Sequence, residues 1–256
     1  MNDNKTEFDD LQGFFAYYPR IAIAFSGGVD SAYLLYAASM YADSVKAYYV
    51  KSAFQPQFEL EDAIRLSKMF DTDMEIIDVD ILSCKDVTDN PPDRCYFCKR
   101  YIFSAILEHA KKDGYTYIAD GTNASDERGD RPGMKALEEM QVLSPLRLCG
   151  ITKAEVRKRS KDAGIFTWDK PAYACLATRI PTGCVIDKAG LARTEKAEDY
   201  LKSIGLKDFR VRTCGELARL QVREEDMTLV SEYREEILAR LTEDYEGVVL
   251  DLKCRA

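Results

Sequence analysis

The sequence predicts an α/β protein with a parallel sheet covered by helices on both faces, followed by a second, smaller α/β domain. Its 256 residues suffice for one domain with a smaller companion. Short apolar strands alternate with helical patterns through the first part of the chain. The character of the sequence changes after about residue 180. We therefore predict domains at residues 1–179 and 180–256.

The first strand is predicted at residues 20–25, where β-branched and small apolar residues run without a polar interruption. A helix is expected from Ser31, because the apolar residues that follow are spaced as one face. Further strands are predicted at 46–50, 74–80 and 115–120, and further helices at 58–70, 96–112 and 152–163. Residues 82–94 and 121–148 are predicted as loops, the second with one short helical piece. In such sheets, ligands bind beyond the carboxyl ends of the strands.

The second domain opens with the turn-rich segment IPTGCVID. Within this domain we predict helices at 189–204 and 227–241 and strands at 209–213, 219–222 and 248–253. These elements predict a small α/β fold.

Charge and hydropathy exclude several classes of protein. With 36 basic and 44 acidic side chains the net charge is −8, which argues against a general electrostatic affinity for nucleic acid or an anionic membrane. No apolar stretch approaches the ~20 residues of a membrane helix, and the acidic start is unlike a secretory signal. We therefore expect a cytoplasmic protein. The single histidine, His109, is predicted on an exposed helix face, so chemistry built on histidine bases is not expected.

The segment Ser26-Gly27-Gly28-Val29-Asp30-Ser31 lies directly between the first strand and the first helix. Its two glycines let the backbone approach an anion closely, and the helix start offers free N–H groups. The hydroxyls of Ser26 and Ser31 add donors, while Asp30 can cap the helix or bind Mg²⁺. The segment lacks the Walker pattern, so it predicts a different kind of phosphate-binding loop.

Cysteines supply the second chemical signal. Cys95 and Cys98 form a CxxC pair whose spacing suits zinc or an iron–sulfur cluster. No second pair completes a four-ligand zinc site. Cys175 stands alone in the run KPAYACLATRIP at the predicted domain junction. Composition alone favours the interpretation that this third cysteine is a small buried residue of a linker.

The SGGVDS loop resembles the signature of the PP-loop ATP pyrophosphatases, a Rossmann-like superfamily that cleaves ATP to AMP and pyrophosphate. The resemblance covers about the first 170 residues. It implies that Gly121, Thr122 and Asn123, which follow a predicted strand, also contact the nucleotide. ATP and Mg²⁺ are the implied cofactors, with Asp126 as a second candidate Mg²⁺ ligand beside Asp30.

A narrower resemblance extends across nearly the whole chain. SGGVDS, DGTNASD, RPGMKAL, ITKAEVR, TWDKPAYACLATRIPTG and VRTCGELARLQV together look like the LarE family of ATP-dependent sulfur transferases. That resemblance implies adenylylation of a carboxylate of pyridinium-3,5-dicarboxylate mononucleotide and its conversion to a thiocarboxylate. The implied pathway is synthesis of the nickel-pincer nucleotide cofactor.

The same family has two chemical variants. In one, a cysteine at the position of Cys175 gives up its sulfur and becomes dehydroalanine; in the other, that cysteine and a CxxC hold a [4Fe-4S] cluster that passes on a sulfide. Because Cys95, Cys98 and Cys175 are all present, the chain resembles the cluster variant. The remaining cysteines are predicted to be structural: Cys84, Cys149, Cys184, Cys214 and Cys254.

Arg210 and Arg212 alternate by two in a predicted strand, so both point to one face. One interpretation of such a pair is a binding site for a phosphate or a carboxylate. The other is a solvated strand face whose positive charge offsets that of nearby acidic side chains. The family resemblance favours binding of the substrate phosphate, and Arg179 is a further candidate. The chain departs from the family at Cys214 and Gln221, where His and Glu are frequent.

Three other readings stay open. Thiolation of tRNA uses related chemistry, but it needs a basic surface, which the net charge of −8 disfavours. The three cysteines could instead hold a metal that only stabilises the fold, or Cys175 could donate its own sulfur. The expected partners are a small nucleotide substrate, a sulfide or sulfur donor and further copies of this chain in a homo-oligomer, with neither nucleic acid nor a membrane.

Overall fold

The computed structural model describes residues 8–126 and 132–255 and divides the chain into two compact units. The first unit comprises Met1–Val79 and Asp93–Ala172, and the second comprises Asp80–Pro92 and Tyr173–Ala256. The segment 80–92 thus leaves the first unit, folds with the second and returns.

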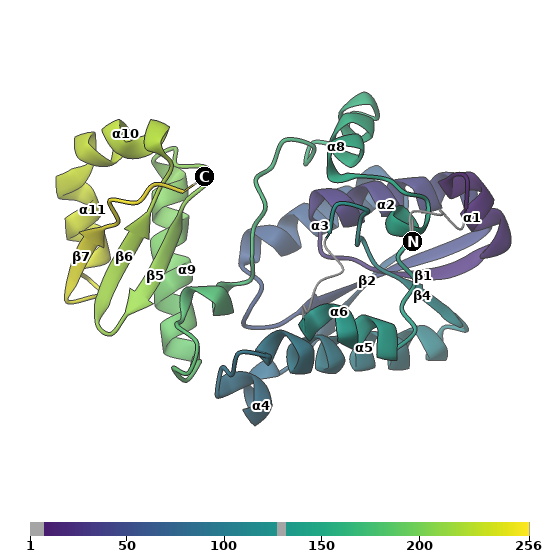
Figure 1. The fold of residues 1–256 in the computed structure, drawn as a ribbon, viewed down its shortest axis with the longest axis horizontal. Helices are drawn as coiled ribbons and strands as arrows, with labels where there is room; N and C mark the ends of the chain where they lie inside the picture. The colour runs from purple at the N-terminus through teal and green to yellow at the C-terminus, as the bar shows by residue number, and fades with distance from the viewer. Residues whose placement is uncertain (1–7, 127–131, 256) are drawn as a thin grey trace, which may run out of the picture. The chain divides into compact units, whose positions relative to one another are not determined.

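A four-stranded parallel sheet forms the centre of the first unit, as predicted (Figure 1). Its strands are β1 (Arg20–Ala24), β2 (Ser44–Lys51), β3 (Met74–Asp78) and β4 (Tyr117–Ala119), in the order β3-β2-β1-β4. From β1 the chain adds β2 and β3 on one side and β4 on the other, which makes the space between β1 and β4 a topological switch point.

Helices cover both faces of this sheet because its strands are apolar on both sides. In β1, Ile21 and Ile23 pack into one buried cluster and Ala22 packs into the other. The helices of this unit are α1 (Leu11–Tyr17), α2 (Val29–Tyr41), α3 (Gln57–Met69), α5 (Arg94–Lys112), α6 (Pro132–Glu139), α7 (Pro145–Leu148) and α8 (Lys153–Asp162). Helices α2 and α3 lie on one face and α5 and α6 on the other (Figure 1).

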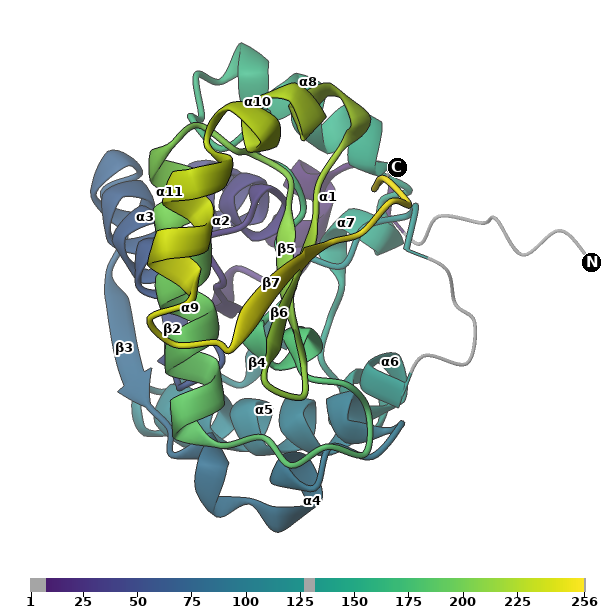
Figure 2. The same cartoon turned by 90° about the vertical axis from the view of Figure 1, so that its left-hand side faces the viewer.

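The second unit is a three-stranded sheet with helices packed against it (Figure 2). Its strands are β5 (Arg210–Cys214), β6 (Leu217–Gln221) and β7 (Gly247–Leu250), with β5 antiparallel and β7 parallel to β6. Its helical segments are η1 (Ile81–Ser83), α4 (Lys85–Thr88), η2 (Leu176–Arg179), α9 (Lys188–Ser203), η3 (Glu224–Asp226), α10 (Met227–Glu232) and α11 (Arg234–Leu241). One apolar cluster joins α9, α10 and α11 to the strands.

The structure differs from the predicted elements in several places. The segment 121–148, predicted with one short helical piece, contains both α6 and α7. Helix α1 was not predicted; its Phe14 and Phe15 are fully buried and fix it to the core. The predicted loop at 82–94 contains helix α4, and the single helix predicted at 227–241 is interrupted at Tyr233. Among the described residues no helix is long and apolar enough to cross a lipid bilayer.

Candidate functional site

The SGGVDS loop lies where β1 ends and α2 begins, at the carboxyl edge of the sheet and at its switch point. Gly27 has φ +74°, and a Cβ there would lie 3.1 Å from the Glu59 carbonyl oxygen. The hydroxyl oxygens of Ser26 and Ser31 lie 3.0 Å apart. The first N–H groups of a helix have no carbonyl partner within that helix. At the start of α2 they are available to an anion, so the loop forms an anion-binding cradle.

The loop after β4 closes one side of this cradle. A Cβ on Gly121 would lie 2.7 Å from the backbone nitrogen of Ser31, closer than real contacts allow, so only glycine fits here. The structure therefore brings together the two segments that the sequence singled out for a nucleotide. The close approach of Gly121 to helix α2 could not be read from the sequence.

Side chains beside the cradle form a polar chain. Lys153 Nζ lies 2.5 Å from Asp30 Oδ2, and Asn123 Nδ2 donates to Asp30 Oδ1 at 3.3 Å. The backbone N–H of Asn123 in turn donates to Asp126 Oδ2 at 3.0 Å. Asp30 thus already has a cationic partner, one that sequence reasoning missed. Within residues 8–126 and 132–255, no three or more His, Cys, Asp or Glu side chains are grouped so that they could hold a metal ion.

A cavity of about 630 Å³ opens beside the cradle within the first unit. The SGGVDS loop, Gly121 and Thr122 line one part of it, and apolar side chains of β2 and α5 line another. Cys95 also lines the cavity. Its volume is in the range of small-ligand sites, and its mixed lining suits a ligand with an apolar ring and an anionic group.

The CxxC pair lies in the first turns of α5. Cys95 is exposed and Cys98 half-buried, and the Arg94 guanidinium lies 3.8 Å from Cys95 Sγ. Residues three apart share one helix face, so both thiols can serve one metal centre. Metal ions bind the thiolate form of cysteine, and the Arg94 guanidinium supplies positive charge beside this pair.

Lys99, one turn beyond Cys95, lines the same cavity and was missed by sequence reasoning. Burial lowers its pKa, although Asp120, Cys95, Asp126 and Cys98 act in the opposite direction. No described residue forms a hydrogen bond or ion pair with its ammonium group. The sequence signal that could have identified it is its spacing of four from Cys95. Lys99 is thus a cation in the cavity wall with capacity for an anionic ligand.

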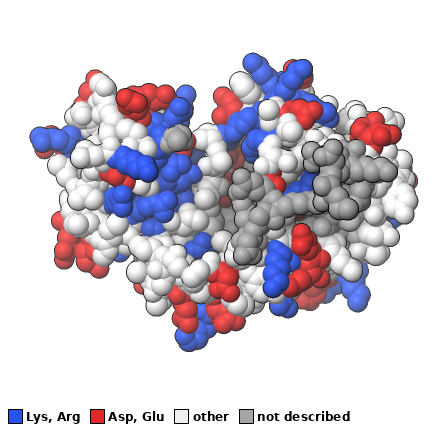
Figure 3. All heavy atoms as spheres, in the orientation of Figure 1, with Lys and Arg blue, Asp and Glu red and all other residues white. Residues whose placement is uncertain are grey.

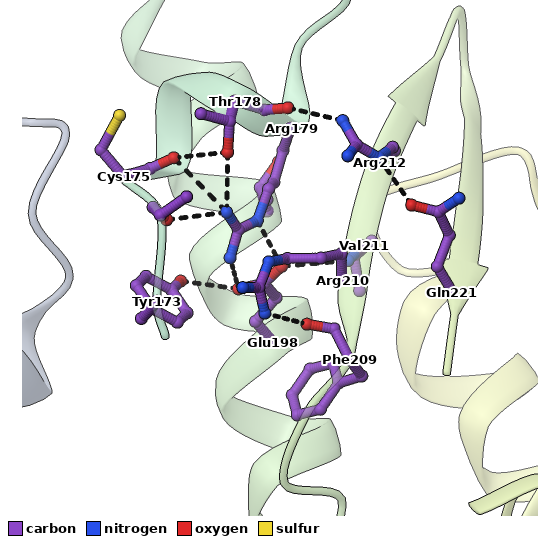
Figure 4. Close-up of polar contacts among 12 residues, drawn as sticks. Tyr173, Cys175, Thr178, Arg179, Glu198, Phe209, Arg210, Val211, Arg212 and Gln221 are labelled. Carbon is purple, nitrogen blue, oxygen red and sulfur yellow. Dashed lines mark hydrogen bonds and ion pairs between the residues drawn. The ribbon is translucent and has the colours of Figure 1, made fainter. Parts of the chain in front are cut away.

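Arg179 and Glu198 form a buried ion pair in the second unit (Figure 4). Arg179 donates from Nε and Nη2 to the two carboxylate oxygens at 2.7 and 2.9 Å, and its side chain is 0% exposed. Glu198 also accepts from the hydroxyl of Tyr173 and the backbone N–H of Val211. Burial alone would lower the pKa of Arg179, but its hydrogen bonds to Glu198 raise it. The pair is a fixed structural centre.

This pair holds the backbone around Cys175. Arg179 Nη1 donates to the Ala174 carbonyl at 2.7 Å and more weakly to that of Cys175 at 3.4 Å, and Thr178 donates to the Cys175 carbonyl through its hydroxyl at 2.8 Å. In Figure 4 the sulfur of Cys175 points away from the arginines. The carbonyls are therefore fixed while the half-buried thiol points outward.

Arg210 and Arg212 both lie on β5, as predicted. Arg212 donates to the Gln221 amide oxygen at 2.6 Å and to the Thr178 carbonyl at 2.8 Å. Burial lowers the pKa of Arg212, and repulsion from Arg179 lowers it further. The same two causes lower the pKa of Arg210 to about 10. Lys and Arg side chains gather over this part of the second unit (Figure 3). Such a concentration of positive charge favours binding of an anion.

The sequence also drew attention to Gln221, as a departure from the family, and to His109, as an exposed helix residue. Gln221 bridges Arg212 and the carboxylate of Asp251, to which its amide nitrogen donates at 2.6 Å, so it orients an arginine. His109 is half-buried rather than exposed, and its Nδ1 lies 2.5 Å from Glu75. It does not line the cavity of the first unit.

The candidate residues thus fall into two groups. The SGGVDS loop, Gly121–Asn123, Cys95 and Cys98 belong to the first unit. Cys175, Arg179, Arg210 and Arg212 belong to the second.

Comparison with known proteins identifies the family of this chain. The chain is 30% identical to the pyridinium-3,5-bisthiocarboxylic acid mononucleotide synthase of Lactiplantibacillus plantarum, over 80% of this chain and 75% of that protein. The chain belongs to the LarE family. It is accordingly an ATP-dependent sulfurtransferase of the PP-loop type.

Other relatives agree with this assignment. An uncharacterized Synechocystis protein, slr1717, is 36% identical over 87% of this LarE-family chain and 84% of its own length. The tRNA-specific 2-thiouridylase MnmA of Thermotoga petrophila is 26% identical over 57% of this chain and 52% of its own length. No family model matches the chain.

Proposed function

We propose that this LarE-family chain adenylylates a carboxylate of pyridinium-3,5-dicarboxylate mononucleotide and replaces one of its oxygens by sulfur, within nickel-pincer nucleotide synthesis. The observation that carries the proposal is the shared cavity of the first unit, which the SGGVDS loop and Cys95 both line. A phosphate cradle beside a thiol is what coupling of ATP cleavage to sulfur transfer requires. The product named for the Lactiplantibacillus relative supplies the substrate class.

In the first step a substrate carboxylate oxygen attacks the α-phosphorus of ATP. A new P–O bond forms, the bond to the β-phosphate oxygen breaks, and pyrophosphate leaves with the electron pair. The N–H groups at the start of α2 and the hydroxyls of Ser26 and Ser31 stabilise the charge that builds on pyrophosphate. In the second step a sulfide attacks the acyl carbon, a C–S bond forms, and AMP leaves with the carboxyl oxygen.

Mg²⁺ is proposed to accompany ATP. Asp30 and Asp126 both line the cavity and are linked through Asn123, so their carboxylate oxygens are the candidate ligands. Lys153 already balances the charge of Asp30. The lysine and the metal ion are thus alternative partners for that carboxylate.

The substrate phosphate is proposed to bind at Arg210 and Arg212. Burial, then repulsion from Arg179 and Arg255, lowers the pKa of both guanidiniums, and a bound dianionic phosphate offsets that repulsion. Arg179 is committed to Glu198 and to the backbone at Ala174. We therefore assign Arg179 to holding Cys175 in place rather than to direct contact with the substrate.

The sulfur is proposed to come through Cys95, Cys98 and Cys175. Thiolates are the usual ligands of iron–sulfur clusters, so these three cysteines would hold a [4Fe-4S] cluster, which would supply the sulfide for the transfer. Arg94 and Lys99 supply positive charge beside the first two thiols, which would balance the negative charge of a bound cluster. The Arg179–Glu198 pair holds the backbone of the third.

The proposal is tested by anaerobic incubation of the reconstituted protein with ATP, Mg²⁺, sulfide and the dicarboxylate nucleotide. We expect pyrophosphate release that depends on the nucleotide, and a thiocarboxylate product by mass spectrometry. Replacing Arg212 by Lys should raise the KM for that nucleotide about tenfold or more, since it loses a charge-assisted contact. Arg240→Lys, on the exposed face of α11, is the matched control.

Absence of pyrophosphate release would contradict the proposal. The remaining interpretation would be that the three cysteines hold a metal that only stabilises the fold. Dehydroalanine at Cys175 after turnover, detected by intact mass, would show that the cysteine itself donates the sulfur. Tight, salt-sensitive retention of bulk tRNA on a filter would instead favour tRNA thiolation, the activity named for the MnmA relatives.

A further inference from the structure

The loop that follows β2 carries a polar side chain to which the reaction described above gives no role. This loop spans residues 52–56 and joins β2 to α3 within the first unit. Ser52 is buried and Phe54 is fully buried, which fixes the loop to the unit. Gln55 is half-buried and lines the cavity beside the phosphate cradle. What Gln55 can offer to a ligand therefore depends on how the loop holds its amide.

The side-chain oxygen of Gln55 faces Ser52. The backbone N–H of Ser52 donates to Gln55 Oε1 at 3.1 Å, and the Ser52 hydroxyl donates to the same oxygen at 2.7 Å. That hydroxyl in turn accepts from the Phe54 backbone N–H at 3.2 Å. Because a backbone N–H can only donate, the amide atom that faces it is the oxygen and not the nitrogen. The backbone of the loop thus sets the orientation of the amide.

The other polar groups of Gln55 are engaged as well, apart from its amide nitrogen. An amide oxygen has two lone pairs, and the two hydrogen bonds from Ser52 occupy both. The backbone carbonyl of Gln55 accepts from Lys51 Nζ at 2.8 Å, and its backbone N–H donates to the Ser52 carbonyl at 3.3 Å. No residue among those that the structure describes accepts a hydrogen bond from Nε2. Any hydrogen bond from Gln55 to a ligand of the cavity is therefore a donation from Nε2.

The place of Gln55 in the cavity suits the base of a nucleotide. The phosphate cradle lies where β1 and β4 end, whereas Gln55 follows β2, which pairs with the other side of β1. Tyr48 and Val50, near the end of β2, line the cavity just before this loop, together with apolar side chains of α5. A flat ring packs well against such a wall. The edge of an adenine ring carries the nitrogens N1, N3 and N7, each of which accepts a hydrogen bond.

We propose that Gln55 recognises the base of ATP, with Nε2 donating a hydrogen bond to a ring nitrogen of adenine. The proposal rests on the binding of ATP in this cavity, which the proposed function uses. A glutamine amide that can rotate presents either its oxygen or its nitrogen, whereas Ser52 restricts this one to donating. Such preorganisation lowers the entropic cost of the contact. A base with an acceptor at that position is thus favoured over one that has a C–H or an N–H there.

The test compares ATP with 1-deaza-ATP, 3-deaza-ATP and 7-deaza-ATP, in each of which a C–H replaces one ring nitrogen. Calorimetric titration measures each affinity with Mg²⁺ present and the dicarboxylate nucleotide left out, so that no sulfur transfer takes place. For the wild type we expect at least one analogue to bind about five- to tenfold more weakly than ATP, because a hydrogen bond is lost. That penalty should vanish when residue 55 can no longer donate.

Two variants remove the donor. Gln55→Glu keeps the size of the side chain and an oxygen for Ser52, but its carboxylate cannot donate. Its negative charge weakens the binding of all four nucleotides, so the informative quantity is the ratio of the affinities for the analogue and for ATP. Gln55→Met removes the donor without adding a charge. In both variants ATP should bind about fivefold or more weakly, and the sensitive analogue should bind as well as ATP.

Gln57→Glu is the matched control. It makes the same chemical change two positions along the chain, at an exposed residue that does not line the cavity. Because the added charge is the same, this control shows how much of the effect of Gln55→Glu is electrostatic. The wild-type ratios between ATP and its analogues should persist in it.

Equal affinity of the wild type for ATP and all three analogues would overturn the role of Gln55 and leave the proposed function standing. The same conclusion would follow if the penalty for an analogue persisted in both Gln55 variants. Failure of the wild type to bind ATP, together with absence of pyrophosphate release in the reaction described above, would overturn the proposed function. The role of Gln55 would then be rejected with it.

Discussion

The two units build their candidate sites from different materials. In the first unit the anion cradle is made of backbone: glycines that bring chain segments close, and N–H groups at the start of a helix. In the second unit the candidate anion site is made of arginine side chains: Arg212 is held by the Gln221 amide oxygen, and the Arg179–Glu198 ion pair holds the backbone at Ala174. A backbone cradle depends on the space that a glycine leaves open, whereas the arginine site depends on pairs of side chains remaining intact.

The largest effect is expected from Cys175→Ala, which separates the chemistry of the two units. The substitution should reduce formation of thiocarboxylate to background, because the third thiol is lost, while nucleotide-dependent pyrophosphate release continues. Both products are measured in one anaerobic reaction. Equal loss of the two activities would show instead that Cys175 is needed for folding or for adenylylation.

The next effect concerns the paired side chains of the second unit. Arg179→Met leaves the buried carboxylate of Glu198 without its cation, which should destabilise the unit by about 3–5 kcal/mol. Urea unfolding measures this loss. The double variant Arg179→Met with Glu198→Leu should recover much of it, since no uncompensated charge remains. If the single and double variants were equally stable, the pair would have no structural role.

The backbone cradle of the first unit is tested at Gly121. Gly121→Ala forces a Cβ to 2.7 Å from the Ser31 nitrogen, which should cost about 1–3 kcal/mol of stability and sharply reduce ATP-dependent pyrophosphate release. Gly114→Ala is the control: Gly114 has φ +80° but no atom within 4 Å of the added Cβ. It should cost about 1–2 kcal/mol through backbone strain and leave the activity intact.

The smallest effect is expected at Lys99, a charged side chain in the site that is otherwise built of backbone. No residue in the described part of the chain pairs with its ammonium group. Its pKa is lower in the folded than in the unfolded chain, so the folded state binds fewer protons and stability should rise as pH increases toward about 10.4. Lys99→Met should therefore melt at a higher temperature than wild type at pH 7, and the difference should vanish at high pH.

The same variant should weaken ATP binding about tenfold, because a charge-assisted contact is lost. Calorimetric titration measures this affinity. Unchanged affinity together with an unchanged melting temperature would mean that Lys99 is an ordinary solvated lysine.

The comparison also explains what the sequence could predict. The phosphate loop is contiguous, so its strand, glycines and helix start are visible within residues 20–31, and the parallel sheet follows from strands that alternate with helices. The arginine site depends on partners that are distant in sequence, such as Glu198 for Arg179. No local pattern specifies such pairs.

Other features needed the folded chain for the same reason. The contact of Gly121 with Ser31 and the ion pair of Lys153 with Asp30 each join segments about 90 or more positions apart. The segment 82–94 was predicted as a loop from its Asp, Asn and Pro content, yet its residues up to Pro92 fold with the second unit, where Asn90 bonds to Pro181. Composition indicates a turn, but it does not say against which surface that turn packs.

The three-thiol cluster site is tested most directly by the iron and acid-labile sulfide content of protein reconstituted without air, in wild type and in Cys175→Ser. We expect about four irons and four sulfides per wild-type chain, with a brown, oxygen-sensitive chromophore, and a clear loss of both in the variant. A colourless wild-type protein, or a variant that holds the same iron and sulfide as wild type, would contradict it.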